Sequence, residues 1–425
     1  MATSRRPSPP TIVLGLLCVM YLITYVDRVN ISTAADSIKR ELGLSNTELG
    51  VLQSAFGYPY LLFQVFGGWI GDRFGPRRTL FLCGVTWAAA TILTGFSGGL
   101  VTLFLCRLLV GIGEGATFPV ATRAMQSWTP LGRRGFAQGL THAFARLGNA
   151  VTPPIVAWLI VMISWRGSFV VLGCCSLVWV LLWVWYFRDT PADHPAITSD
   201  DLERLPNRGA PATILRPRVP WRALTRRMTP VTIVYFCYGW TLWLYLTWLP
   251  LYFLHEYRFD LKKSALFTSA VFFAGVVGDY LGGVISDRIL HRTGNLEKAR
   301  RNVVMMGFAG SFACLVPVFL THDLVMIIVS LGAAFFFAEI VIGPMWSIPM
   351  DIAGKFSGTA AGMMNTGSAL AAILSPIAFG YIIDRTGNWQ LPFAGSLGFL
   401  LLGAILAPTM HPERPFDESG NRVIV

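Results

Sequence analysis

The chain has 425 residues, of which 54% are hydrophobic and 13% are charged, and its formal net charge is +11. Soluble proteins normally carry about 25% charged residues. This composition therefore excludes a soluble enzyme and places most of the chain in lipid. Seven cysteines lie within apolar stretches and none has the spacing of metal ligands, so we expect neither a metal site nor a bound cofactor.

Apolar runs in chain order predict the membrane-spanning helices, each needing about 20 residues. The first run follows Arg5 and Arg6 and has no small-residue cleavage site, which indicates an uncleaved first span. Twelve runs can be marked, over residues 11–35, 47–71, 79–97, 100–121, 136–163, 166–187, 229–254, 264–286, 302–320, 324–349, 358–383 and 391–409. They predict an all-α membrane protein with two six-helix halves, residues 1–187 and 229–425, and a polar, cytoplasmic linker at 188–228.

The distribution of Lys and Arg over the loops predicts the orientation of the chain. Of 34 basic residues, 24 fall in segments on the side of the N-terminus, seven on the opposite side and three inside spans. Both termini are therefore expected in the cytoplasm of a multi-pass protein of the bacterial inner membrane. The net charge is a topology signal, so the expected partner is the lipid bilayer and not nucleic acid.

The two halves repeat each other in sequence. Residues 67–73 read GGWIGDR and residues 282–288 read GGVISDR, and the fifth and eleventh spans match more loosely, with His142 aligned to Asn365. Parallel duplication of a six-span unit places a binding site at the interface of the halves, near the bilayer midplane.

The loop after the second span carries a family resemblance. The pattern from Gly68 through Asp72-Arg73-Phe74-Gly75-Pro76-Arg77-Arg78 resembles the signature of the major facilitator superfamily, with a weaker copy at 283–288. Residues 25–30 (YVDRVN), 107–115 (RLLVGIGEG) and 342–365 are similar to the anion:cation symporter family. That resemblance implies alternating access, no enzymatic activity, a monomer, and proton-coupled import of a small organic anion.

Functional residues follow from the resemblance and from the charges inside spans. The resemblance implies proton coupling by Asp27 and Glu114 and places Arg28 and Arg107 as cations beside them. The full set expected to bind substrate is Tyr25, Arg28, Tyr60, Arg107, His142, Arg146, Tyr238, Glu339 and Asn365. A cytoplasmic gate is expected at Asp72, Arg73, Arg77, Arg78, Asp287 and Arg288.

Charged residues inside a span cost a few kcal/mol each and usually serve a function. Arg107 and Glu114 are seven residues apart and so share one helix face. Protonated acids would leave the arginines free to hold an anion, and ionised acids would compete for the same arginines and release it. The alternative is a structural network, in which Asp27 and Arg28 simply neutralise each other.

Three further residues leave alternatives open. Arg146, where many relatives have Gln or Ser, either binds a second carboxylate, neutralises Glu114 or packs. Glu339 is a hydroxyl acceptor, a third proton site, or a structural residue hydrogen-bonded to Trp or Tyr. Tyr238 shares a helix face with Tyr245 and Tyr252 and belongs to a gate, a sugar-stacking surface or an interfacial aromatic belt.

The leading hypothesis for the substrate is a sugar acid, namely a hexonate, hexuronate or aldarate. Aromatic or short-chain carboxylates and dicarboxylates are the alternative. A drug-exporting antiporter of the same fold is disfavoured, because exporters of cations would not need the excess of buried arginines. A non-transporting receptor stays open at this point.

Overall fold

The computed structural model describes residues 8–130, 134–205, 220–321, 323–353 and 357–414, and these contain helices and no strand. The first half comprises α1 (Pro9–Leu42), α2 (Asn46–Ser54), α3 (Gly57–Phe74), α4 (Pro76–Gly95), α5 (Leu100–Gly115), α6 (Thr117–Trp128), α7 (Arg134–Met162) and α8 (Trp165–Tyr186). The linker holds η2 (Pro191–Asp193) and α9 (Ser199–Arg204). The second half comprises α10 (Trp221–Glu256), α11 (Leu261–Thr293), η3 (Glu297–Arg301), α12 (Asn302–Leu315), η4 (Val316–Phe319), α13 (Leu324–Ile340), α14 (Ile342–Ala353), α15 (Ser357–Thr386), α16 (Leu391–Leu406) and η6 (Ala407–Met410).

Every predicted span falls on a helix or on consecutive helices. In the described residues, ten helical stretches are long and apolar enough to cross a membrane. The spans predicted at 47–71 and 229–254 are not among them. The former is divided between α2 and α3, and the latter lies in α10, a 36-residue helix with many Trp and Tyr residues.

Three predicted spans are each divided into two α-helices, and a proline follows each break within four residues. Pro59, Pro119 and Pro344 are the third residues of α3, α6 and α14. Proline has no backbone N–H, so each removes the hydrogen bond that would join the two pieces into one helix. The residues left without that bond are Ala55, Gly115 and Ile340.

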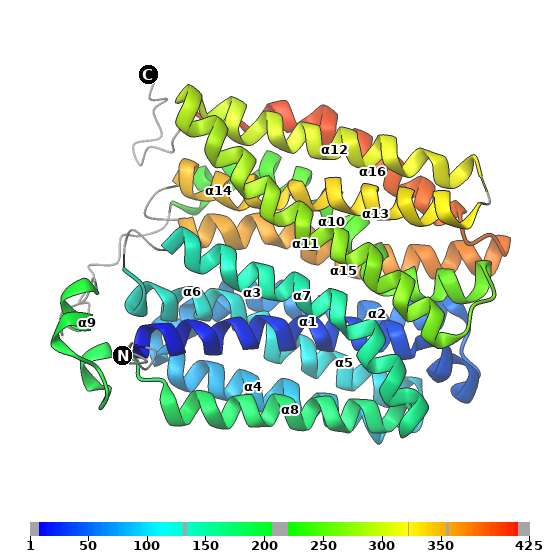
Figure 1. Cartoon of the computed structure of the whole chain (residues 1–425), viewed down its shortest axis with the longest axis horizontal. Coiled ribbons are helices and arrows are strands. Elements are labelled where there is room, and N and C mark those ends of the chain that lie inside the picture. Colours follow the sequence, from blue (N-terminus) through cyan, green and yellow to red (C-terminus); the bar gives the residue numbers. More distant parts are fainter. Residues whose placement is uncertain (1–7, 131–133, 206–219, 322, 354–356, 415–425) are drawn as a thin grey trace, which may run out of the picture.

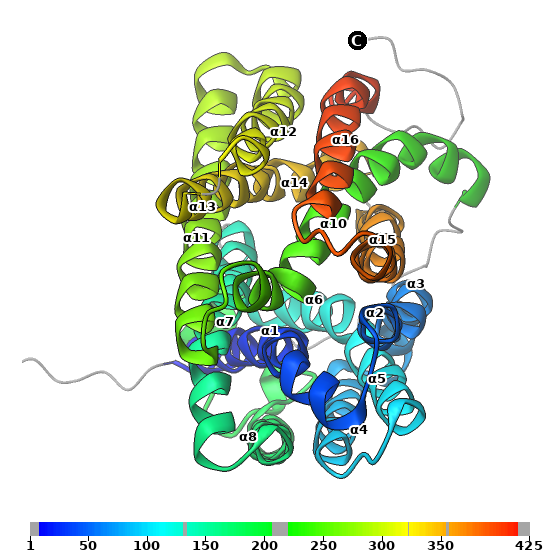
Figure 2. The same cartoon turned by 90° about the vertical axis from the view of Figure 1, so that its right-hand side faces the viewer.

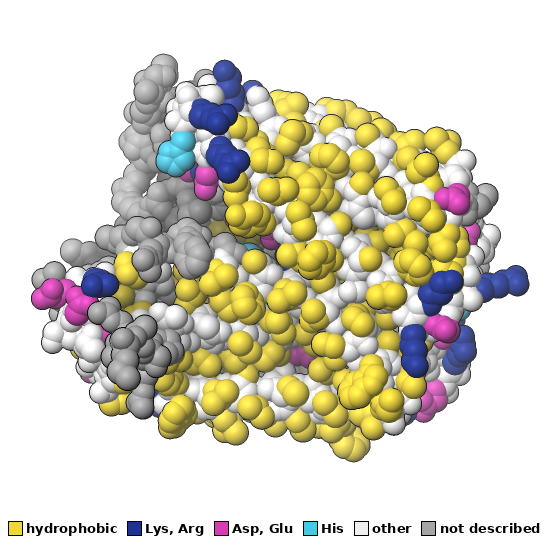
Figure 3. Space-filling model, in the orientation of Figure 1, with side chains coloured by type: hydrophobic (Ala, Val, Ile, Leu, Met, Phe, Trp, Pro, Cys, Tyr) yellow, Lys and Arg dark blue, Asp and Glu magenta, His cyan; other side chains and the backbone are white. Residues whose placement is uncertain are grey.

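The axes of the long helices are roughly aligned with one another, and successive helices run back and forth along the bundle (Figure 1). The chain enters α1 at the same end of the bundle at which α16 finishes. In Figure 2 the helices of the two halves form separate groups, α1–α8 below and α10–α16 above. The face of the molecule shown in Figure 3 is covered mostly with hydrophobic side chains, whereas most of its visible Lys, Arg, Asp and Glu side chains lie toward the two ends. This surface fits a protein surrounded by lipid between two aqueous phases.

The end at which α1 finishes and α2 begins is called the outer end here, following the loop charges. At this end the halves pack closely, α2 against α15 and α7 against α11. A Cβ on Gly50 would lie 2.4 Å from the Pro376 carbonyl oxygen, and one on Gly380 would lie 2.3 Å from the Asn46 oxygen. Only glycine allows these backbones to approach so closely, so the two halves are in direct backbone contact at this end.

A carboxylate from the second half caps a helix of the first half at the outer end. Asp384 accepts hydrogen bonds from the backbone and side chain of Asn46 (3.1 and 2.8 Å) and of Thr47 (2.6 and 2.5 Å). The N-terminus of a helix carries partial positive charge, which favours an anion there. A second link joins His255 Nε2 to Asp36 Oδ1 at 3.2 Å, between α10 and α1.

We expect Asp384→Asn to shift the protein toward an outside-open form by about tenfold, or about 1.4 kcal/mol, because it removes charge-assisted hydrogen bonds between the halves. Spin labels at Val101 and Leu320, both exposed at the outer end, would report the change as a larger population of long distances. The exposed Cys174 and Cys175 would first be replaced. Asp323→Asn is the matched control, since Asp323 caps only α13 of its own half. Equal distance distributions in Asp384→Asn and the native protein would contradict this role.

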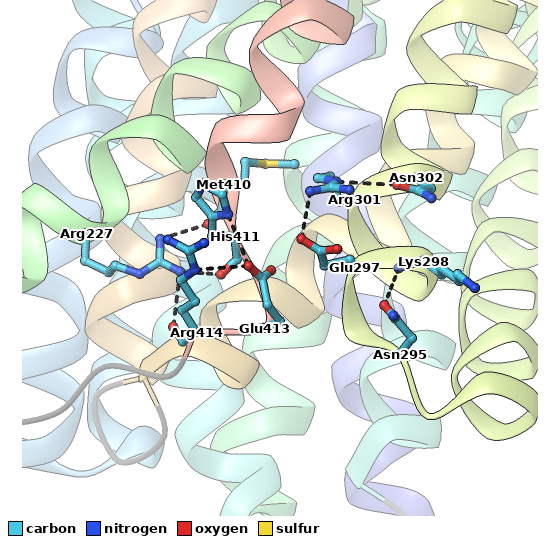
Figure 4. A network of polar contacts seen from close by, with 10 residues as sticks. All are labelled: Arg227, Asn295, Glu297, Lys298, Arg301, Asn302, Met410, His411, Glu413 and Arg414. Atoms are coloured by element: carbon cyan, nitrogen blue, oxygen red, sulfur yellow. Dashed lines mark hydrogen bonds and ion pairs between the residues drawn. The ribbon is translucent and has the colours of Figure 1, made fainter. Parts of the chain in front are cut away.

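At the opposite end, Arg227 of α10 holds the described C-terminal residues (Figure 4). Its guanidinium donates to the backbone oxygens of Met410, His411 and Arg414, with distances of 2.8 Å to Met410 and 3.2 Å to Arg414. Glu297, His411 and Glu413 have potential metal-ligand atoms within 4.8 Å of one another. Both carboxylates already pair with arginines, Glu297 with Arg301 and Glu413 with Arg414, so we assign no metal to this cluster.

Candidate functional site

A cavity of about 30 Å³ lies between the halves, next to the helix breaks. Water needs roughly 10–15 Å³ measured in this way, so the cavity has room for a few water molecules. Its lining from the first half is Tyr25, Arg28, Tyr60, Phe118, His142 and Arg146. Its lining from the second half is Tyr235, Leu242, Trp243, Leu246, Trp346, Asn365 and Ser368. The predicted interface between the two repeats is therefore where the cavity lies.

Arg28 forms the cationic wall of the cavity on the side of the first half. Its Nε donates to Glu114 Oε2 at 2.9 Å, and both side chains are buried. The guanidinium carbon also lies 4.6 Å from the ring centre of Tyr25 and 4.8 Å from that of Tyr60. Aromatic faces attract cations, so the rings and the carboxylate hold the Arg28 side chain in place while it faces the cavity.

Asp27 and Arg107 lie behind this wall and do not line the cavity. Arg28 and Arg107 both pack against the ring of Phe56, with guanidinium carbons 5.1 and 5.3 Å from its centre. The Asp27 carboxylate is buried, as is the Arg107 side chain. Proton coupling by Asp27 and direct substrate contact by Arg107 stay predictions, and the geometry makes Arg28 the more direct anion contact.

A second buried charged group joins the two halves. Arg146 Nε of α7 lies 2.9 Å from Glu339 Oε2 of α13 and 3.4 Å from Asp279 Oδ2 of α11. The hydroxyl of Tyr238 donates to Glu339 Oε1 at 3.1 Å and accepts from Arg146 Nη2 at 3.4 Å. Among the described residues Arg146 therefore pairs with acids of the second half, and no ion pair joins it to Glu114.

The sequence analysis missed Asp279. It lies inside the eighth predicted span, 264–286, so the rule that singled out Glu339 as a charge within a span applies equally to it. Tyr238 and Glu339 were expected to contact substrate, yet both lie behind Arg146 and outside the cavity lining. The hydrogen bond from Tyr238 matches one of the three alternatives given for Glu339, namely a structural residue that is hydrogen-bonded to Trp or Tyr.

Polar side chains complete the cavity. Asn365 Nδ2 donates to Gln64 Oε1 at 3.1 Å, which connects α15 to α3 across the two halves. The His142 ring centre lies 5.4 Å from that of Trp346, whose Nε1 donates to the Tyr235 hydroxyl at 3.0 Å. Asn365 and His142 thus line the cavity, and their contact with substrate stays a prediction. Gln64 and Trp346 were not singled out from the sequence.

The described members of the predicted cytoplasmic gate contact their own halves. Arg77 donates to the Val184 carbonyl (3.1 and 2.6 Å) and, through its backbone N–H, to Asp189 Oδ1 at 2.9 Å. Burial raises the pKa of Asp189, which lies in the loop after α8. In the second half, Arg300 bridges Asp287 (3.1 Å) and Asp351 (3.0 Å).

Of the remaining predicted gate residues, only the side chains of Arg78 and Arg288 are described by the structure. The side chains of Arg78 and Arg288 are exposed, and those of Asp72 and Arg73 lie outside the described residues. A gate formed by these residues stays a prediction.

The fold and the site first define a class: an all-helical membrane protein of two repeated halves that enclose a charged cavity, as in secondary transporters. The model of a family described as the Major Facilitator Superfamily matches residues 17–376 and 298–423. The chain belongs to the major facilitator superfamily, a family of transporters and not of enzymes, as the sequence analysis expected.

Three relatives illustrate the similarity. The chain is 49% identical over 413 residues to the probable sulfoacetate transporter SauU of Cupriavidus necator, covering 96% of both chains. It is 30% identical to the D-galactonate transporter of Escherichia coli O6:H1 (92% and 93% covered) and 29% identical to the probable galactarate/D-glucarate transporter GudP of E. coli K12 (96% and 93% covered).

Solved structures support the same fold. The crystal structure of a bacterial homologue of the human lysosomal transporter Spinster, in an inward-facing and unoccupied conformation, superposes with a TM-score of 0.77. The two chains are 17% identical, and the match covers 95% of this chain and 97% of the other.

Proposed function

We propose that this protein imports a small organic anion together with protons, by alternating access of its two six-helix halves. In this proposal the chain crosses the bacterial inner membrane twelve times and both termini lie in the cytoplasm. The carrying observation is the buried pair of Arg28 and Glu114, with Arg28 facing the cavity between the halves. A guanidinium recognises carboxylates and related oxyanions by paired hydrogen bonds.

Competition for Arg28 supplies the coupling. When Glu114 is ionised it occupies Arg28 Nε, at the observed 2.9 Å. When Glu114 is protonated, the positive charge of Arg28 is no longer balanced, and an anion in the cavity balances it instead. Anion and proton therefore enter the site together and leave it together. Asp27, one residue before Arg28 and close in space to Arg107, is the second proposed proton-coupling residue.

Two substrate classes follow from the relatives and the cavity. A sugar acid matches the names of the galactonate and glucarate relatives. A short substrate with two acidic groups matches the name of the 49% identical relative, and the small cavity with many aromatic walls favours it over a six-carbon polyol. We therefore place sulfoacetate and comparable short dianions first, and sugar acids second.

Uptake into proteoliposomes tests this proposal. We expect an acid-outside pH gradient to drive accumulation of sulfoacetate, malonate, galactonate or glucarate, offered singly at equal concentration. Collapse of the gradient with a protonophore should reduce accumulation to the level of equilibration. Liposomes without protein are the control. If accumulation of every transported anion were the same with and without the pH gradient, proton coupling would be contradicted. If none of the four anions were transported, the proposed substrate classes would be contradicted.

A further inference from the structure

We propose that Asp279 and Glu339, held by Arg146, form a further proton-binding site at the junction of the halves, where the two carboxylates share one proton. The site is distinct from the Asp27 and Glu114 positions of the first half. The inference rests on the proposed function for its role in transport, although the protonation itself is independent of it.

Geometry brings the two acids to one cation. Glu339 Oε2 and Asp279 Oδ2 lie 2.9 and 3.4 Å from the same nitrogen, Arg146 Nε. The two carboxylates therefore share one cation, and their oxygens lie no more than about 6.3 Å apart, the sum of the two distances. The side chains of Arg146 and Asp279 are 4% and 11% exposed and that of Glu339 is fully buried, so bulk water does not screen the repulsion between the acids.

The charge count leaves one negative charge unbalanced. Two carboxylates face one guanidinium, and in the described part of the chain no other Lys, Arg or His lies within ion-pair distance of either acid. The remaining titratable groups around Arg146 are the phenols of Tyr25, Tyr235 and Tyr238 and the imidazole of His142. Two carboxylates that share a buried site cannot both ionise readily, so one proton between them restores neutrality.

Hydrogen bonding gives an independent indication. Tyr238 donates to Glu339 Oε1, but Glu339 Oε2 and Asp279 Oδ2 are buried without any hydrogen-bond partner. The contacts of both oxygens with Arg146 Nε are ion pairs. Buried acceptors are normally satisfied by donors. A proton on one acid would reduce the number of buried acceptors that need a donor.

The position of Arg146 connects this proton to transport. Arg146 belongs to the first half, both acids belong to the second, and the same guanidinium lines the cavity. An anion that binds Arg146 takes over the positive charge that balanced one ionised carboxylate, so the two acids then bind a second proton. When the halves move apart and separate Arg146 from the acids, the number of protons that the acids bind rises in the same step.

Infrared spectroscopy of the purified full-length protein at neutral pH tests the charge count through the band of protonated carboxyl groups. Asp279→Asn and Glu339→Gln should each lose one protonated carboxyl, because one acid and one guanidinium need no proton. Arg146→Gln should gain one, because two acids without a cation need two protons. Asp200→Asn, in the exposed ion pair of α9, is the control and should leave the band unchanged. An unchanged band in both acid variants would overturn the proposal.

Transport stoichiometry provides the second measurement. From reversal potentials in proteoliposomes, the double variant Asp279→Asn, Glu339→Gln should move one proton fewer per substrate than the native protein, because no carboxylate is left to take up a proton when Arg146 binds the anion. Each single variant keeps one such carboxylate and should keep the native ratio. An unchanged ratio in an active double variant would overturn the role in coupling. If the native protein moved no protons with its substrate, the proposed function would fail, while the infrared series would still decide whether the carboxylates share a proton.

Discussion

Arg28→Gln is expected to weaken substrate binding and lower transport by at least about 100-fold. Truncating one partner of a buried, hydrogen-bonded charge pair costs about 2–5 kcal/mol, or roughly 30- to 4,000-fold. For the bound anion Arg28 is that partner, because its positive charge faces the cavity. Binding by calorimetry and substrate exchange in proteoliposomes measure the two effects separately.

Two further variants sharpen the interpretation of Arg28. Arg28→Lys keeps the charge but not the planar guanidinium, and we expect it to fall between the native protein and Arg28→Gln. Arg204→Gln is the matched control, because the Arg204 side chain is 70% exposed and pairs with Asp200 of the same short linker helix. Binding by Arg28→Gln within about threefold of the native value would reject Arg28 as the anion contact.

Glu114→Gln is expected to separate transport from the proton gradient. Gln has nearly the shape of protonated Glu and cannot ionise, so Arg28 stays permanently available to an anion. We expect exchange of substrate across the membrane to continue while accumulation driven by the gradient falls at least about tenfold, to equilibration. Exchange should also lose most of its dependence on pH.

The measurements are counterflow exchange and gradient-driven uptake in the same liposomes. Glu203→Gln, in the short linker helix α9, removes an exposed carboxylate and should leave both unchanged. Undiminished gradient-driven accumulation in Glu114→Gln would reject a coupling role for this residue. Proton coupling would then have to be carried by Asp27 or by the acids paired with Arg146, Asp279 and Glu339.

Hydropathy predicted the positions of the helices well, because a lipid environment requires long apolar runs with satisfied backbones. It did not predict the three breaks, since a run of apolar residues has the same hydropathy whether the helix is continuous or divided. The signal was nevertheless present in the chain. Pro59, Pro119 and Pro344 each remove the hydrogen bond that would cross a break.

The candidate site was predictable where its parts lie on one helix or match a family pattern. Arg28 and Glu114 were expected together, and the structure pairs them. The partners of Arg146 were not predictable in this way, because Asp279 and Glu339 follow it by more than 130 residues and belong to the other half. Spacing along one helix reveals a shared face, whereas contacts between halves depend on how the halves pack.

The proline breaks have a mechanical consequence for the transport cycle. A continuous helix must break backbone hydrogen bonds in order to bend. At each of these breaks the proline already lacks the N–H that would donate one of those bonds. The segments beside the cavity can therefore tilt relative to those at the outer end without losing further backbone hydrogen bonds. Bending at these positions changes side-chain packing more than backbone hydrogen bonding. We therefore expect the helices to bend at Ala55, Gly115 and Ile340 during each transport cycle.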